Sequence, residues 1–505
     1  MEELKERRKK WECLFLECIK DGKIDVEAFL ELLEEKEREE IYGFTWPGKK
    51  KAYLLSKEPQ KSCLVPVKEE SREWEKTKNV FIEGENLEAL KILQENYCKK
   101  IGMIYIDPPY NTNRDFVYQD SYAEKERNRM GTKKKLGGSY HRKWLSMMYP
   151  RLLISRNLLR EDGIMLINID EHEYVNLQKL MEEIYGEDNQ LGTIIWDKRN
   201  PKGDAKGIAI QHEYIVIYAK NKKEYLQSNP LKRRKKNAQK ILKTAEDIYN
   251  KYKEENKIEE GRKEFARWMA KQQSFSGGEK AYHKLDEDGQ VYRLVSMAWP
   301  NKKKPPADYF IPLIHPVTGK KCPVPHRGWR NSPAKMKELL EKGEIVFGKD
   351  ETVQPARKYL LKDNQYENIP SVIYYGGSDD LLLKDMGIPF DTPKVLSIVT
   401  EHILNFSKRE DKILDFFAGS ATTAHGVMKA NAMDGGERSF LIVQMPEQIE
   451  KRHDAYKKGF RKVSEITKRR LEIAGDNIIK EKKGVDTGFR KYVVTPFPNE
   501  DGMEE

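Results

Sequence analysis

The sequence predicts an α/β protein with a mainly parallel sheet, into which a basic domain is inserted. Apolar runs such as 101–106 and 163–169 alternate with an amphipathic stretch at 86–97, and this pattern resumes near Pro393. Residues 221–360 interrupt it, because they are basic, contain prolines and lack a regular period. We therefore expect an N-terminal helical or extended segment (1–78), two halves of one α/β domain (79–220 and 361–505) and an added domain (221–360).

The composition limits the class of protein. A chain of 505 residues is too long for one compact core and predicts two or three domains. The net charge of +11 favours a polyanionic partner. We expect a cytoplasmic protein, because the N-terminus is charged and no apolar run reaches the roughly 18 residues of a membrane span. The five cysteines are scattered without a Cys-x-x-Cys pair, which argues against a zinc module and fits a reducing compartment.

The remaining elements follow from periodicity and turn residues. Residues 1–42 predict helices broken at Asp21-Gly22, and 43–78 predict irregular structure. In chain order we then expect a strand at 80–84, a helix at 86–97, a strand ending at Asp107, a mobile polar flap to Ser139, a helix at 144–159, and strands at 163–169, 194–196, 214–218 and 291–294. Glu171-His172-Glu173 is too closely spaced for one helical face, so we interpret it as loop charges and expect no metal.

A carboxylate followed by two prolines and a tyrosine ends the strand at 101–106. The motif is Asp107, Pro108, Pro109 and Tyr110, at the end of the strand where open α/β sheets bind ligands. Proline has no backbone donor, so rigid carbonyl acceptors remain. Acceptors, a carboxylate and a ring suit a planar base with an exocyclic amine, which would bond to Asp107 and a proline carbonyl while Tyr110 stacks on the ring. Holding both N–H groups favours a tetrahedral nitrogen with a usable lone pair. A tight loop without function is the alternative.

A second motif lies about three hundred residues later. The strand 412–415 runs into a turn of small residues and then a helix. Small residues let a ligand approach the backbone, and a helix N-terminus favours a negative group. Only Gly419 is glycine, so the turn does not match the Gly-x-Gly-x-x-Gly of dinucleotide sites. The pattern instead suits S-adenosylmethionine, with its amino group on Asp415 and its carboxylate on backbone amides near Gly419 and Thr422.

The other predicted cofactor contacts surround this turn. Phe416 or Phe417 would border the ligand, and Ser420 belongs to the same turn. The next apolar strand ends at Gln444, and Glu447 follows it. Either side chain could accept a bond from the ribose, and the sequence leaves both open.

The basic charge is concentrated in one region. Residues 221–275 contain 16 Lys and Arg against 8 Asp and Glu, a net charge of +8 by subtraction. The densest run is Lys232, Arg233, Arg234, Lys235 and Lys236. Basic side chains neutralise phosphates and release counterions, so the run predicts contact with DNA, with a solvated helix face as the alternative.

Taken in order, these features resemble the β class of amino-group DNA methyltransferases, and more closely the modification (Mod) subunits of type III restriction-modification systems. The segments that carry the resemblance are 43–49, 82–87, 105–112, 212–214, 415–423, 443–447 and 486–490. The resemblance implies a Rossmann-like S-adenosylmethionine-dependent methyltransferase sheet with an inserted target-recognition domain. It also implies N6 methylation of a flipped adenine in double-stranded DNA, a homodimer, and a restriction (Res) subunit that carries an ATP-driven motor and a nuclease.

Three further observations concern short segments or single residues, and the first two come from the resemblance. Phe390–Lys394 is similar to the segment that packs beside the cofactor, so Lys394 is a candidate cofactor contact, and Asn86 is a weaker one. Ala421 stands where a second glycine is frequent, and its methyl group could crowd the ligand. Gly43–Lys50 nearly matches the sequence pattern of a phosphate-binding loop, but Lys50 stands where that pattern has the Ser or Thr whose hydroxyl binds Mg²⁺.

Three other functions compete with adenine methylation. N4-cytosine methylation uses the same geometry, although such enzymes usually begin the motif with Ser-Pro-Pro. Structural RNA could be the substrate, or the chain could be a catalytically silent DNA-recognition subunit. Cytosine C5 chemistry is excluded, because it requires a cysteine after proline, and Cys322-Pro323 has the reverse order.

Overall fold

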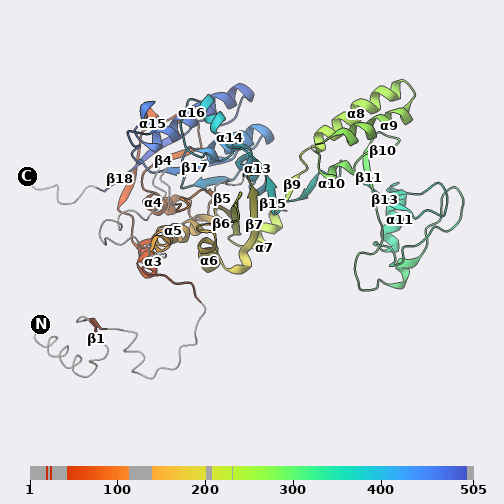
Figure 1. The fold of residues 1–505 in the computed structure, drawn as a ribbon, viewed down its shortest axis with the longest axis horizontal. Coiled ribbons are helices and arrows are strands. Elements are labelled where there is room, and N and C mark those ends of the chain that lie inside the picture. Colours follow the sequence, from red (N-terminus) through yellow and green to blue (C-terminus); the bar gives the residue numbers. More distant parts are fainter. Residues whose placement is uncertain are drawn as a thin grey trace, which may run out of the picture.

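The computed structural model describes residues 19–20, 23–24, 43–112, 139–200, 207–229, 231–273 and 275–497. Its main feature is a sheet of ten strands, which Figure 1 shows at the centre of the larger lobe. Across the sheet these are β15 (Val372–Tyr374), β7 (Gln190–Asp197), β8 (His212–Ala219), β6 (Leu159–Ile169), β5 (Ile101–Ile106), β16 (Lys412–Asp415), β17 (Ser439–Gln444), β4 (Val80–Glu83), β18 (Arg490–Pro496) and β3 (Ser62–Pro66). The strands are parallel except that β8 is antiparallel to both neighbours and β3 is antiparallel to β18. The predicted α/β class is confirmed.

The two halves of the sequence meet in the middle of this sheet. β5 comes from the first half and β16 from the second, and they pair in parallel with Met103 opposite Ile413 and Ile104 opposite Leu414. Both strands are buried apart from Lys412. Because parallel strands end at the same edge, the residues after β5 and β16 come together there.

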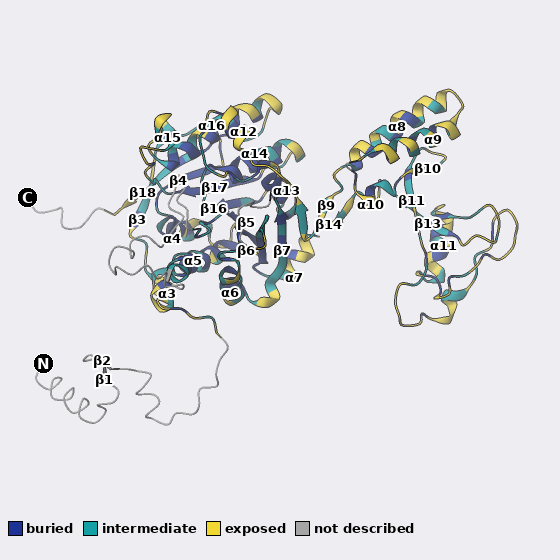
Figure 2. Ribbon diagram, viewed as in Figure 1, coloured by how far each residue is buried: buried dark blue, intermediate teal, exposed yellow. Residues whose placement is uncertain are grey.

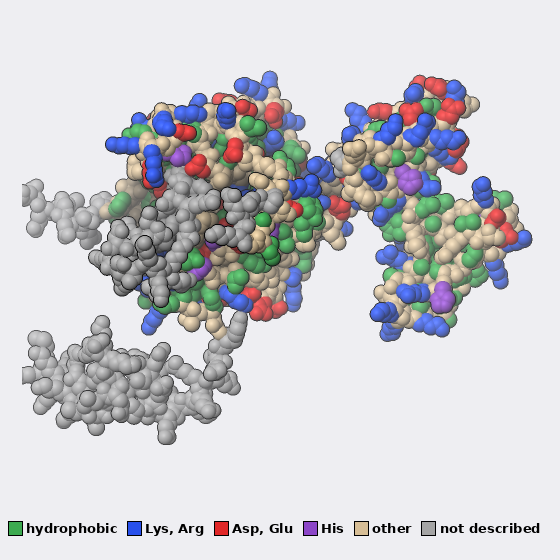
Figure 3. Space-filling model, viewed as in Figure 1, with side chains coloured by type: hydrophobic (Ala, Val, Ile, Leu, Met, Phe, Trp, Pro, Cys, Tyr) green, Lys and Arg blue, Asp and Glu red, His purple; other side chains and the backbone are tan. Residues whose placement is uncertain are grey.

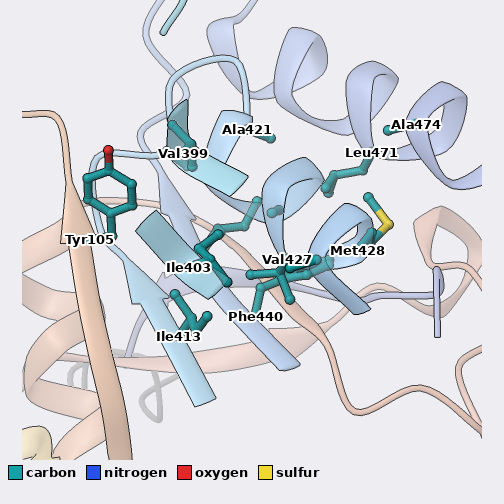
Figure 4. Packing of buried hydrophobic residues seen from close by; sticks show 14 of the residues in the cluster. Tyr105, Val399, Ile403, Ile413, Ala421, Val427, Met428, Phe440, Leu471 and Ala474 are labelled. Atoms are coloured by element: carbon teal, nitrogen blue, oxygen red, sulfur yellow. The ribbon is translucent and has the colours of Figure 1, made fainter. Parts of the chain in front are cut away.

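Helices cover both faces of the sheet. α4 (Asn86–Tyr97), α5 (Ser139–Leu158) and α6 (Tyr174–Tyr185) pack with α3 (Lys49–Lys57) on one face. α13 (Leu396–Phe406), α14 (Thr422–Asp434) and α16 (Val463–Glu481) pack on the other. Side chains alternate along a strand, so Ile413 faces the second group while Leu414 faces the first. Figure 4 shows Ile413 with side chains of α13 and α14, and Figure 2 shows the buried residues concentrated in this lobe.

The N-terminal region differs in part from the prediction. β1 (Ile19–Lys20) and β2 (Lys23–Ile24) pair antiparallel where the sequence predicts helix, and the rest of 1–42 lies outside the described residues. Residues 43–78 are not irregular throughout, because they form α3 and the edge strand β3. The predicted flap falls largely on 113–138, also outside the described residues.

The basic region forms a second lobe beside the sheet (Figure 1). A ribbon of β9 (Lys232–Arg234) and β14 (Tyr366–Asn368) connects it to the first lobe. The lobe contains α8 (Ala238–Glu254), α9 (Ile258–Lys271), α10 (Gly277–Lys280), α11 (Pro333–Glu341) and a sheet of β10 (Lys284–Leu285), β11 (Val291–Val295), β13 (Ala356–Leu360) and β12 (Ile345–Val346). The strand expected at 291–294 is confirmed. The prediction of irregular structure was wrong for 238–271, which contains α8 and α9. A few apolar side chains, such as Ile241 and Phe265, recur at helical spacing among many charged residues and are buried.

Short elements complete the structure: α7 (Lys222–Ser228), α12 (Asp380–Asp385), α15 (Asp454–Lys457) and the 3₁₀ turns Lys68–Glu70, Glu187–Asn189 and Ala307–Phe310. Within the described part of the chain, no helix is both long and apolar enough to cross a membrane.

A glycine in β5 leaves no room for a side chain. A Cβ at Gly102 would lie 2.3 Å from the Cγ of Asp411, which is buried. We expect Gly102→Ala to lower the free energy of unfolding by about 1–3 kcal/mol, as overpacking of a core does. The midpoint of chemical denaturation would measure this effect. Gly277→Ala is the control, because no atom lies within 4 Å of a Cβ there, and its expected effect is within about 0.5 kcal/mol. An unchanged midpoint for Gly102→Ala would contradict the packing described here.

Candidate active site

A cavity of about 320 Å³ lies at the shared edge of β5, β16 and β17. It is lined by Asp107 and Pro109 from the first motif, by Asp415, Phe416, Phe417, Gly419, Ser420 and Thr422 from the second, and by Gln444, Glu447, Lys394 and Asn86. The structure therefore brings the two motifs into one crevice. Pro108 is buried and Tyr110 half-buried in the same loop, directly beside Asp107.

Asp107 is held by two neighbours through one oxygen. The Tyr110 hydroxyl donates to Oδ1 of Asp107 at 2.8 Å, and Nζ of Lys394 lies 3.2 Å from the same atom. Burial raises the pKa of Asp107, and the charge of Lys394 opposes this shift. Burial, together with the Asp107 and Glu213 carboxylates, raises the pKa of Tyr110 well above its usual value. Tyr110 therefore keeps its proton and remains a donor.

Glu213 on β8 was missed as a functional candidate. Its carboxylate pairs with Lys394 at 2.7 Å and with Lys198, and it accepts a 3.3 Å bond from the Tyr110 hydroxyl. Burial alone would raise the pKa of Glu213, but Lys394 and Lys198 outweigh it and lower the pKa to about 2. The available signal was its place in segment 212–214, which carries the family resemblance and directly precedes the apolar run of β8. Lys394, predicted as a cofactor contact, thus lines the cavity beside Asp107 and Glu213.

Glu173 fixes the end of the first motif. Asn111 has a left-handed backbone with φ of 59° and donates to Oε1 of Glu173 at 2.6 Å. Glu173 is fully buried and also contacts His141 at 2.7 Å and Asn176 at 2.6 Å. Glu173 lies in the turn before α6, as expected of a loop charge, but it is buried and hydrogen-bonded. Its partners Asn111 and His141 come from other segments and leave no trace in local spacing.

Two further contacts hold the loop and the strand before it. Nε1 of Trp144 donates to the Pro109 carbonyl at 2.7 Å, and Nδ2 of Asn168 donates to the Ile106 carbonyl at 3.1 Å. Nearby, Asp170, Glu171 and His172 bring potential metal-ligand atoms within 4.8 Å of one another. One of these contacts is a 2.9 Å hydrogen bond between Nδ1 of His172 and Oδ2 of Asp170.

The cofactor turn has an unusual backbone. Gly419 and Ala421 have φ of 52° and 67°, in the left-handed region. The Ala421 side chain is fully buried in the hydrophobic cluster of Figure 4 and is not among the residues that line the cavity. The expectation that its methyl group crowds a ligand was therefore wrong.

The amide of Gly419 is already occupied, because it donates to Oε1 of Gln444 at 2.7 Å. Of the amides near Gly419 and Thr422 that were predicted to bind the ligand carboxylate, the one of Gly419 is thus engaged within the protein. Asp415 accepts a bond from the Phe417 amide at 2.9 Å, and burial raises its pKa to about 7. Burial likewise raises the pKa of Glu447 to about 7.

The sequence profile of one family, described as DNA methylase, matches residues 101–451. This chain belongs to the DNA methylase family. The EcoP15I Mod subunit of a type III restriction-modification enzyme from Escherichia coli is 33% identical over 509 residues, which cover 95% of this methylase and 76% of that protein. The EcoPI Mod subunit of Escherichia phage P1 is 31% identical, with coverages of 91% and 72%. The type II methyltransferase M.KpnI of Klebsiella pneumoniae is 30% identical, with coverages of 78% and 87%.

The family and these relatives establish the general reaction. The chain is a DNA methyltransferase that depends on S-adenosylmethionine, of the kind found as Mod subunits. The cavity of this methylase fits that cofactor: the carboxyl groups of the buried Asp415 and the half-buried Glu447 can accept bonds from an amino group and a diol, and Phe416 and Phe417 offer apolar contact.

The basic run lies in the ribbon that joins the two lobes. Arg233 pairs with Glu367 at 2.9 Å, Arg234 donates to Gln365 at 2.7 Å, and Lys235 donates to the Tyr366 carbonyl at 3.0 Å. Lys232 and Lys236 are exposed. Part of the run therefore fastens the ribbon, and Figure 3 shows Lys and Arg side chains at this junction and along the added lobe.

The two raised carboxyl pKa values predict a pH dependence of cofactor binding. Below about pH 7, Asp415 and Glu447 are mostly protonated in the free methylase. S-adenosylmethionine carries a net positive charge and favours the ionised carboxylates. Its affinity should rise by up to about tenfold per carboxylate between pH 6 and pH 8, with release of protons.

Titration calorimetry in two buffers of different ionisation enthalpy would measure both effects. Glu447→Gln should reduce the number of protons released, because one titrating group is removed. An affinity that stays constant from pH 6 to pH 8 in the unaltered methylase would contradict the assignment.

Proposed function

We propose that this methylase methylates N6 of an adenine that is flipped out of double-stranded DNA, as the Mod subunit of a type III restriction-modification enzyme. The single observation that carries the proposal is the cavity shared by Asp107 and Asp415. It offers a carboxylate for an amine on one side and a cofactor turn on the other. Flipping removes the base from the stack, at a cost of a few kcal/mol, and brings N6 within reach.

The base side of the cavity fits an exocyclic amine. Both side-chain contacts of Asp107 with described residues use Oδ1, so Oδ2 can accept the amine. The Pro109 carbonyl is occupied by Trp144, which makes the Pro108 carbonyl the second acceptor in this proposal. Tyr110 is held at its hydroxyl by Asp107, and its ring would stack on the base. The charge of Lys394 favours the ionised form of Asp107.

The cofactor side orients the methyl donor. Asp415 binds the amino group, and Glu447 binds the ribose, because the amide oxygen of Gln444 is occupied by Gly419. S-adenosylmethionine supplies an electrophilic methyl group when bound. Alignment of the amine with that group provides much of the rate. Asp107 is the nearest carboxylate for the proton that the amine loses.

The proposal extends to partners. The relatives whose names include a Mod subunit belong to type III restriction-modification enzymes. We therefore expect a Res subunit with an ATP-dependent motor and a nuclease, assembly of the methylase as a homodimer, and activity in the cytoplasm.

The modified base tests this function directly. Duplex DNA incubated with the methylase and labelled cofactor should yield N6-methyladenine after nucleoside digestion. Asp107→Asn should reduce the rate at least a hundredfold, because a carboxamide cannot hold the amine in the same way, while cofactor affinity stays within about threefold. Asp162→Asn is the control, since Asp162 lies in β6 well before its carboxyl end. N4-methylcytosine as product, or full rate in Asp107→Asn, would overturn the assignment.

We also propose that the junction between the lobes contacts DNA phosphates. Lys232→Ala, Arg234→Ala and Lys236→Ala together should weaken DNA binding and flatten its salt dependence, by about one unit of slope for each phosphate that is no longer neutralised. The control triple Lys480→Ala, Lys482→Ala and Lys483→Ala removes as many exposed basic side chains near the end of α16. Binding measured from low to high salt distinguishes the two. Equal slopes for the junction triple and the unaltered methylase would show that DNA phosphates bind to another part of the protein.

A further inference from the structure

A buried arginine lies behind the cofactor turn. Arg470 in α16 has no exposed surface, and its Nη1 donates to Oγ of Ser420 and to Oγ1 of Thr422, both at 2.8 Å. Thr467, one helical turn earlier, donates to the Gly419 carbonyl at 2.6 Å. Successive turns of α16 thus present two side chains to the same short turn.

Among the described residues, no direct partner neutralises the charge of Arg470. No carboxylate of the described residues forms an ion pair with it, and its Nε and Nη2 have no hydrogen-bond partner there. Burial lowers the pKa of Arg470 to about 10, although Asp379 opposes the shift, so the guanidinium remains charged at neutral pH. Burial, with the charges of Arg470 and Lys429, also lowers the pKa of His425 and keeps it neutral. A buried cation with only neutral partners is costly unless an anion approaches it.

Through the two hydroxyls, the positive charge of Arg470 can stabilise a negatively charged ligand group. Each hydroxyl has one donor and two acceptor positions. Both oxygens accept from Arg470. They lie 3.5 Å apart, and one hydroxyl can donate to the other across this long contact, which leaves at least one hydroxyl hydrogen for the cavity that both residues line. Helix α14 begins at Thr422, so the partial positive charge of its N-terminus lies beside the two hydroxyls. With the Gly419 amide occupied by Gln444, these hydroxyls are well-placed donors for an anion.

We propose that Arg470 is a positioning residue that aims the Ser420 and Thr422 hydroxyls at the carboxylate of the methyl donor. The proposal rests on the placement of S-adenosylmethionine given above. It assigns the recognition of the amino-acid carboxylate to two hydroxyls and the buried cation behind them. Arg470 does not itself line the cavity, so it acts through the two hydroxyls.

Ligands that differ only at the carboxylate test this role. Calorimetry on the full chain would compare S-adenosylmethionine with decarboxylated S-adenosylmethionine, which lacks only that group. Arg470→Met should weaken the first ligand by about 10- to 100-fold and the second by less than threefold. Arg470→Lys keeps the charge and should recover part of the preference, and it also replaces the methionine variant if that protein does not fold.

A neighbouring substitution provides the matched control. Thr467→Val removes the bond to Gly419 without changing any charge, so it should weaken both ligands by the same factor. Equal weakening of both ligands in the Arg470 variants would overturn the inference, because it would indicate a merely structural role. If the unaltered methylase bound neither ligand, the proposed cofactor placement itself would fail, which is a distinguishable result.

Discussion

The parallel pairing of β5 with β16 is the constraint on which the site depends. It joins strands about three hundred residues apart and places Asp107 and Asp415 at the same sheet edge. The intervening chain can leave as a separate lobe because β9 and β14 pair and bring its two ends together. The catalytic crevice is thus set by the sheet register, while the added lobe can vary without disturbing it.

Charges on the base side are arranged in compensating pairs. Asp107 and Glu213 face Lys394 and Lys198 in a half-buried cluster. Separating such ions would leave an uncompensated charge, which is strongly destabilising. The cluster therefore holds Asp107 in place through charge, whereas Glu173 and Trp144 hold the same loop through hydrogen bonds.

The sequence revealed the parts of the site whose chemistry is local. Asp107, Tyr110 and Asp415 directly follow apolar strands, so strand pattern and residue type were sufficient to place them. Glu213, Glu173 and Arg470 act on partners that are distant in sequence, and the helix containing Arg470 shows only ordinary alternation of charged and apolar residues. The helices at 238–271 were missed for another reason, because their buried stripe is narrow and charge dominates the composition.

The cofactor turn is fixed before any ligand arrives. Ala421 in the left-handed region costs roughly 1–2 kcal/mol relative to ordinary backbone, and its buried methyl group offsets part of that energy. Gln444 holds the Gly419 amide, Thr467 holds its carbonyl, and Arg470 holds the hydroxyls on either side of Ala421. Contacts from β17 and α16 thus determine one conformation of the turn. A turn ordered in advance spends less of the binding energy on its own ordering, so removing these contacts should weaken cofactor binding even where no ligand atom is touched.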